Sequence, residues 1–324
     1  MREFDPLVAP KEQLGLFGVL EPALPREDPE LAERLRREHS EAARIAERVP
    51  KGVHFGTSTW SFPGWAGIVY SRKATTAELA REGLAQYSRH PLLTTVGIDR
   101  GYYGPIPVRD LERYASQLPA GFPCCAKAPE AVTSAASPDY LRPERFVDEM
   151  VGPFLEVFRD RTGPFVVQFP PAPREATPSP ALFAEKLDRF LAALPAEGRY
   201  AVELRDPALL SPAYASALAC RGAAHVYNYA TAMPMPAEQA RSVPIATASF
   251  TMIRLLLRPG TRYDERREEF LPFDRIVDPS SEMRAQVVRL VRESVRLGRD
   301  VFVLVNNKAE GCSPLTIRAL AERL

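Results

Sequence analysis

Short apolar runs that alternate with amphipathic helical stretches are the feature that most constrains the fold. Eight strand-like runs follow one another, at 53–59, 93–99, 122–127, 164–169, 199–205, 224–228, 246–257 and 301–306. The clearest helical patterns between them cover 76–89, 143–158, 180–194, 281–297 and 314–324. Strands that alternate with helices form parallel sheets, and eight repeats favour a closed barrel over an open, doubly wound sheet. The sequence therefore predicts a TIM-type β/α barrel of eight parallel strands.

The 324 residues divide into a tail, a helix and one large domain. Residues 1–28 carry four prolines among mixed charges, which predicts a disordered N-terminal tail. Residues 29–52 contain an extra N-terminal helix and a linker that ends the helix at Pro50 and Gly52. Residues 53–324 match the roughly 250 residues of a single barrel, with insertions at 100–107 and 258–279 that would lie on its catalytic rim.

Charge and cysteine content exclude few partners but favour one compartment. The formal net charge is +1, so no strong global field recruits nucleic acid or a membrane, and nucleic-acid binding stays open. The four cysteines and four histidines lack the spacing of a metal site or a disulfide framework. The N-terminus has no signal-peptide pattern, and no apolar run approaches ~18 residues. We therefore expect a cytoplasmic protein with reduced thiols and no metal, and the sequence specifies no cofactor.

Polar side chains gather where the predicted strands end. All the carboxyl ends of a β/α barrel's strands lie on one face, so these side chains should converge there. In chain order they are Ser58 and Trp60; Asp99, Tyr102 and Tyr103; Lys127; Gln168; Glu203, Arg205 and Asp206; Asn228; Arg254; and Asn306, Asn307 and Lys308. This set predicts one site for an anionic or hydroxylated substrate.

The segment Glu203-Leu204-Arg205 carries the sharpest signal. Alternation along a strand points Glu203 and Arg205 to the same side, and Leu204 to the other. The pair is either a self-neutralising buried ion pair or a general acid/base beside an anion clamp.

Lys127 and Gln168 each allow more than one interpretation. Lys127 ends an apolar run, so it could bind an anion, pair with Asp99 or Glu203, or act as a Schiff-base nucleophile. The Gln168 amide could bind a ligand or cap the following turn.

Two further segments allow either a site or ordinary packing. Residues 56–65 contain both tryptophans directly after a strand, where Trp60 either lines a pocket or fills the core. The loop at 306–314 offers two asparagines, a lysine and a helix start, which form either an anion cradle or simple caps.

These segments resemble the YecE-like family, which are bacterial proteins with a β/α barrel fold and no established reaction. The resemblance is carried by 56–65, 168–171, 200–207 and 306–314, by the lysine at the end of strand three, and extends over 53–324. The chain departs from the family where Asp206 and Leu256 replace frequent histidines and Gly97 replaces an acid. These differences argue against imidazole chemistry, and a two-carboxylate mechanism would have to use Asp99 with Glu203.

A short motif in the tail points to a different partner. Gln13, Leu14, Leu16 and Phe17 resemble the pentapeptide by which bacterial replication and repair proteins bind the sliding clamp. Such peptides bind through a few buried anchors, but these side chains could also fold back onto the barrel.

The sequence therefore predicts a barrel enzyme for an anionic or phosphate-containing substrate, with DNA metabolism as one setting and a phosphodiester or sugar hydrolase as one candidate. The predicted catalytic residues are Glu203, Lys127 and Asp99. The predicted substrate-binding residues are Trp60, Tyr102, Tyr103, Gln168, Arg205, Asp206, Arg254, Asn306, Asn307 and Lys308. The rival hypothesis is a non-enzymatic accessory protein that the tail attaches to the sliding clamp.

Overall fold

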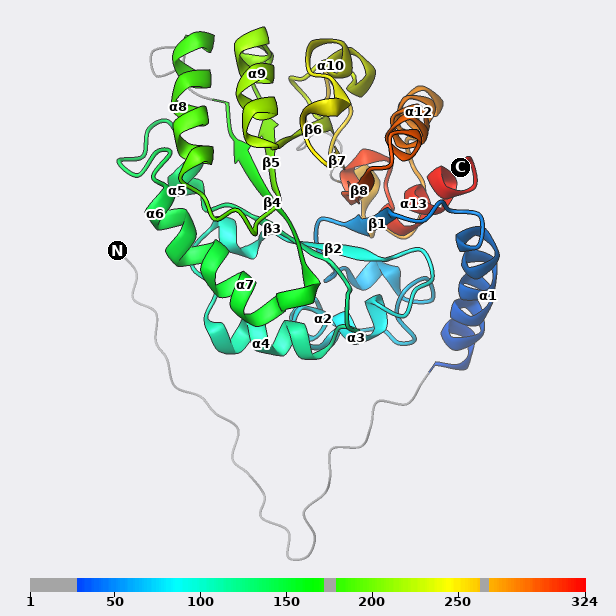
Figure 1. Cartoon of the computed structure of the whole chain (residues 1–324). Coiled ribbons are helices and arrows are strands. Elements are labelled where there is room, and N and C mark those ends of the chain that lie inside the picture. The colour runs from blue at the N-terminus through cyan, green and yellow to red at the C-terminus, as the bar shows by residue number, and fades with distance from the viewer. Residues whose placement is uncertain (1–27, 172–178, 263–267) are drawn as a thin grey trace, which may run out of the picture.

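The computed structural model describes residues 28–171, 179–262 and 268–324, and its centre is a closed barrel (Figure 1). All eight strands are parallel and pair in chain order, and β8 closes onto β1. The strands are β1 Val53–Thr57, β2 Thr95–Ile98, β3 Cys124–Lys127, β4 Thr162–Phe169, β5 Tyr200–Leu204, β6 Ala224–Tyr229, β7 Phe250–Leu255 and β8 Asp300–Val305. The predicted barrel is confirmed. The predicted disordered tail lies outside the described residues.

Helices cover the barrel between the strands. They are α2 Thr76–Glu82, α3 Leu84–Tyr87, α4 Val108–Ser116, α5 Glu130–Thr133, α6 Pro143–Phe146, α7 Gly152–Phe158, α8 Pro180–Ala192, α9 Pro212–Arg221, α10 Pro236–Ser242, α12 Ser281–Arg296 and α13 Ser313–Ala321. Serine side chains cap α8, α9 and α12, and a proline follows the cap of α8 and α9. The predicted helix 143–158 is divided, because the π-helical turn η3 (Val147–Val151) joins α6 to α7.

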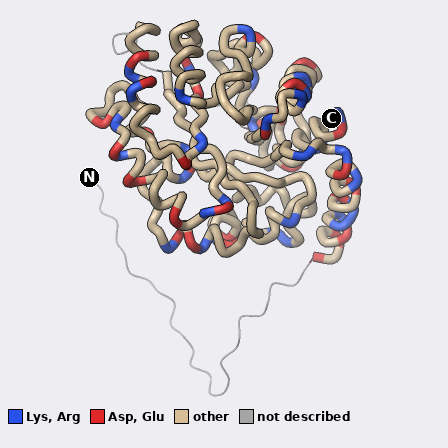
Figure 2. The backbone as a smooth tube through the Cα atoms, in the orientation of Figure 1, with Lys and Arg blue, Asp and Glu red and all other residues tan. Residues whose placement is uncertain are grey.

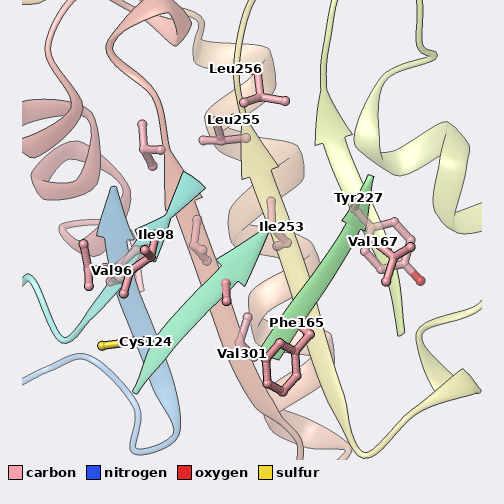
Figure 3. Packing of buried hydrophobic residues seen from close by; sticks show 14 of the residues in the cluster. Val96, Ile98, Cys124, Phe165, Val167, Tyr227, Ile253, Leu255, Leu256 and Val301 are labelled. Carbon is pink, nitrogen blue, oxygen red and sulfur yellow. The ribbon is translucent and has the colours of Figure 1, made fainter. Parts of the chain in front are cut away.

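Two apolar layers hold the barrel together. Side chains alternate along each strand, so one set fills the interior and the other packs under the helices. The interior set is Cys125, Val166, Ala201, Ala224, Val226, Ala248, Phe250, Met252, Phe302 and Leu304. Figure 3 shows part of the outer set, including Cys124, Phe165 and Ile253. The adjacent Cys124 and Cys125 thus belong to different layers, and both are free thiols.

The predicted extra helix is α1 (Pro29–Ala46), which lies beside α13 at the edge of the barrel (Figure 1). Asp28 caps its first turn, and Ala42 and Ile45 are buried. Arg318 of α13 pairs with Glu38 at 3.1 Å and Glu41 at 2.6 Å. Figure 2 shows charged residues spread along α1. In the described parts of the chain, no helix has both the length and the hydropathy of a membrane span.

The loops after β1 and β7 meet on the rim of the barrel. Phe62 and Phe273 pack edge to face, with ring centroids 5.5 Å apart. Gly64 lies so close to this loop that a Cβ there would fall 1.9 Å from the carbonyl oxygen of Pro272. Glycine is therefore required where the two backbones touch.

Candidate functional site at the carboxyl end of the barrel

The carboxyl ends of four strands bring together the charged residues at the centre of the site. Glu203 lies on β5, Arg254 on β7 and Lys127 at the end of β3, while Asp99 begins the 3₁₀ turn η2 (Asp99–Tyr102) that follows β2. Arg205 directly follows β5. Each residue occupies an interior position because the side chain before it on the strand belongs to the outer layer.

Arg254 links two carboxylates inside the barrel. Its side chain is 2% exposed, yet Nη1 donates to Glu203 Oε2 at 2.6 Å and Nη2 donates to Asp99 Oδ2 at 3.0 Å. The other Glu203 oxygen accepts from Arg205 Nε at 2.6 Å. Arg205 Nη2 also donates to Gln168 Oε1 at 3.3 Å. A continuous ionic chain therefore runs from Asp99 through Arg254 and Glu203 to Arg205, and we call these four residues the ion cluster.

Glu203 stays ionised within this cluster. Its complete burial would raise the pKa, but Arg205 and Arg254 outweigh burial and lower the pKa to about 2. A general acid must carry a proton at the operating pH, and this carboxylate does not. Because each Glu203 oxygen also accepts from an arginine, this geometry suits a residue that positions Arg205 and Arg254.

Lys127 lies beside the cluster without a close carboxylate. Its Nζ is 3.4 Å from the centroid of the Tyr102 ring, and no described carboxylate forms an ion pair with it. Burial lowers the Lys127 pKa to about 8, Arg254 and Arg205 act in the same direction, and Asp99 and Glu203 oppose them. Burial raises the pKa of Tyr102, and the Glu130 carboxylate raises it further.

The loop after β8 brings a second lysine into the same field. Asn306 caps the 3₁₀ turn η7 (Asn307–Ala309), because its Oδ1 accepts from Lys308 N at 3.1 Å. Burial lowers the pKa of Lys308, as do Arg205 and Arg254, while Asp99 opposes them. The charges of the ion cluster therefore affect the pKa of Lys308.

The structure does not bring every predicted residue to this site. Trp60 is 5% exposed, donates Nε1 to the Leu79 carbonyl at 2.8 Å and packs edge to face on Tyr114. It therefore belongs to the core, which corrects the expectation that it lines the pocket. The indole ring can be buried against the helices because its single N–H donor finds an acceptor there.

Asn307 and Asp206 have local structural partners. Asn307 is buried, and its Oδ1 accepts from Trp65 Nε1 at 3.2 Å and from both the backbone and the hydroxyl of Ser313. Asp206 caps a 3₁₀ turn by accepting from Ala208 N at 2.9 Å. The contacts of Asn307 correspond to the loop and cap chemistry that was one of the two alternatives for the loop at 306–314.

Sequence reasoning missed a buried polar network behind β6. The His225 ring bonds through Nδ1 to the Tyr214 hydroxyl at 2.9 Å and through Nε2 to Gln239 Oε1 at 3.2 Å. Gln239 in turn donates to the Asn228 carbonyl, and Asn228 Nδ2 donates to the Leu204 carbonyl at 2.8 Å. Burial lowers the His225 pKa to about 4, so the ring is neutral. The one sequence feature that indicated this network was the position of His225, which alternation places on the outer side of β6.

No cluster of three or more metal-ligating side chains occurs in the part of the chain that the structure describes.

A family model described as "Protein of unknown function DUF72" matches residues 54–324. No curated protein matches the chain.

Solved structures that resemble the barrel include two proteins of the same family. A DUF72 family protein from Thermotoga maritima aligns with a TM-score of 0.58 and 20% identity, over 83% of this chain and 99% of its own. One from Enterococcus faecalis aligns with a TM-score of 0.57 and 16% identity, over 83% and 95% respectively. At these identities the likeness concerns the fold.

Proposed function

The chain belongs to the YecE-like family, DUF72, and we propose that its barrel is an enzyme that binds a small anionic or phosphate-containing substrate beside the ion cluster. The observation that carries this proposal is that cationic side chains outnumber carboxylates at the centre of the site. Lys127, Arg205 and Arg254 share only two central carboxylates, and both oxygens of Glu203 are already engaged by arginines.

Two cationic groups supply the proposed anion contacts. Arg205 Nη1 has no hydrogen-bond partner among the described residues, and the side chain is 23% exposed. Lys127 contributes a second positive charge that faces the ring of Tyr102. A planar guanidinium and a compact ammonium together suit a carboxylate or phosphate group.

Asp99 is the proposed proton-transfer group. Its Oδ2 accepts from Arg254, whereas Oδ1 has no hydrogen-bond partner in the described parts of the chain, and the side chain is 32% exposed. Glu203 lacks such access, so we assign it the positioning of the two arginines. A Lys127 pKa of about 8 places a titrating group of the same site near neutral pH.

Calorimetric titration with inorganic phosphate tests the anion site. We expect saturable binding that weakens about tenfold in Lys127→Met and in Arg205→Gln, because each variant removes a charged contact. Arg189→Gln, which changes an exposed arginine on α8, is the matched control and should bind like the parent protein. Unchanged affinity in both site variants would refute the proposal.

The pH dependence gives a second measurement of the same site. Phosphate affinity should fall between pH 7.5 and 9.5, because Lys127 loses its proton as the pH rises through about 8. Lys127→Arg should keep its affinity at pH 9.5, since a guanidinium stays protonated there.

The rival hypothesis, an accessory protein attached to the sliding clamp, depends on Gln13, Leu14, Leu16 and Phe17. These residues lie outside the described part of the chain, so a binding assay has to decide it.

A further inference from the structure

An open cavity of about 390 Å³ adjoins the proposed anion site. The loop after β2, α5 and the region of the π-helical turn η3 all contribute to it. Its lining includes Tyr102, Tyr103, Glu130, Ser134, Arg145 and Glu149. Since Tyr102 lines the cavity and also lies under Lys127, one aromatic ring connects this space to the cations. The volume falls in the range of small-molecule sites, roughly 300–1,000 Å³.

The cavity presents an unusually exposed aromatic ring. Tyr103 is 85% exposed and is the most exposed large hydrophobic side chain among the described residues. It meets Tyr102 edge to face, with centroids 5.3 Å apart. Lys127 Nζ lies 3.4 Å from the centroid of the Tyr102 ring and so occupies one face of that ring. Tyr103 therefore offers a ring face on which a planar group can stack.

The charges of the lining disfavour a second anion. Arg145 is occupied, because it donates Nε to Glu149 Oε1 at 2.9 Å and pairs through Nη1 with Asp139. Glu149 Oε2 is buried and has no partner among the described residues. The exposed Glu130 carboxylate in the lining thus offers an acceptor to neutral N–H and O–H donors. Glu149 also belongs to the π-helical turn η3, an irregularity that often occurs at functional sites.

We propose that this cavity binds the nucleoside part of a nucleoside phosphate. The phosphate contacts Lys127 and Arg205, the base stacks on Tyr103, and the sugar or base donors meet the acceptors of the cavity. This inference rests on the proposed anion site and names its substrate class. A nucleoside phosphate has the required two parts, since an anionic group is joined to a neutral, planar and hydroxylated one.

Calorimetry with three probes tests the subsite: inorganic phosphate, ribose 5-phosphate and adenosine 5′-monophosphate. We expect the nucleotide to bind about tenfold more tightly than ribose 5-phosphate, because only the nucleotide brings a base to stack. Tyr103→Ala should abolish that difference and leave the phosphate Kd unchanged, whereas Tyr103→Phe should retain it. Leu297→Ala, at another exposed apolar side chain, is the control and should leave all three Kd values unchanged.

The possible failures are distinguishable. Phosphate binding with equal affinity for the nucleotide and ribose 5-phosphate would overturn the nucleoside subsite but keep the anion site. An absence of phosphate binding in the parent protein would overturn both. A 5′-phosphorylated trinucleotide separates two sources of the nucleotide: tighter, Tyr103-dependent binding than that of the mononucleotide would assign a strand end, and weaker binding a free nucleotide.

Discussion

The two ends of the barrel both contain an arginine paired with an acid, but the two ion pairs differ in their exposure to water. At the carboxyl end, Arg254 and Glu203 are 2% and 0% exposed and pair at 2.6 Å. At the amino end, Arg199 and Asp300 are 35% and 52% exposed and pair at 3.4 Å. The first pair is removed from water, and the second remains in contact with it.

The neighbours of the two pairs differ as well. Arg199 lies over Phe302 and Phe250, with its guanidinium carbon 5.0 and 5.9 Å from the two ring centroids, and His54 stacks on Phe302. Packing therefore dominates the amino end, where the ion pair is accessory. At the carboxyl end, each buried charged group is stabilised by an oppositely charged neighbour, because burial destabilises a charge that has no partner. In β/α barrels the carboxyl end carries the chemistry, so costly charges are expected there.

The largest expected effect comes from breaking the buried pair. Arg254→Gln leaves Glu203 with one cationic partner and should lower the free energy of unfolding by about 3–5 kcal/mol. The matched variant at the other end, Arg199→Gln, should cost about 1 kcal/mol or less, because its ion pair is partly exposed. Urea denaturation of both variants measures the comparison. Similar losses at the two ends would show that burial does not distinguish them.

Acid titration of stability should give the next largest effect. The Glu203 pKa is about 2 when folded and 4.5 in the reference state, so the folded protein binds this proton less readily. Its contribution is therefore fully present above about pH 4.5 and is lost as the pH falls towards 2. At 1.36 kcal/mol per pKa unit, the loss is on the order of 3 kcal/mol.

Glu203→Gln should flatten this part of the pH profile because the titrating group is gone. Glu185→Gln, at an exposed carboxylate on α8 that pairs with Arg189, is the control and should keep the profile. The prediction is contradicted if the glutamine variant loses stability between pH 4.5 and 2 as steeply as the parent protein does.

The sequence predicted the barrel and the inward direction of Glu203 because both depend on local patterns. Period-2 alternation fixes the side of a strand, and eight βα repeats fix the topology. The pairing of Glu203 with Arg205 follows from the same alternation, but the pairing with Arg254 was not predictable in this way. Arg254 lies 51 residues away and meets Glu203 only after the barrel closes. Pairing across a closed sheet depends on register and tilt, which local composition does not encode.

The fate of Trp60 shows a second limit. A tryptophan after a strand can face the rim or the helices, and what decides is where its indole N–H finds an acceptor. Here the acceptor is the Leu79 carbonyl of α2, and sequence spacing does not reveal this contact between a loop and a helix. The π-helical turn η3 escaped prediction because the 143–158 pattern alone is that of a continuous helix.

The smallest expected effect on stability comes from residues 1–27, which lie outside the described part of the chain. Deleting residues 1–27 should change the free energy of unfolding by less than about 0.5 kcal/mol, because the deletion keeps Asp28, which caps α1.

A peptide covering residues 11–20 should bind a bacterial sliding clamp at roughly micromolar Kd, and Leu16→Ala with Phe17→Ala should abolish that binding. A loss of more than about 1 kcal/mol on deletion, without clamp binding, would instead mean that Leu14, Leu16 and Phe17 pack onto the barrel or α1. Unchanged stability together with clamp binding would separate the two functions physically: the carboxyl end of the barrel would hold the substrate, and the tail would determine where in the cell that substrate is met.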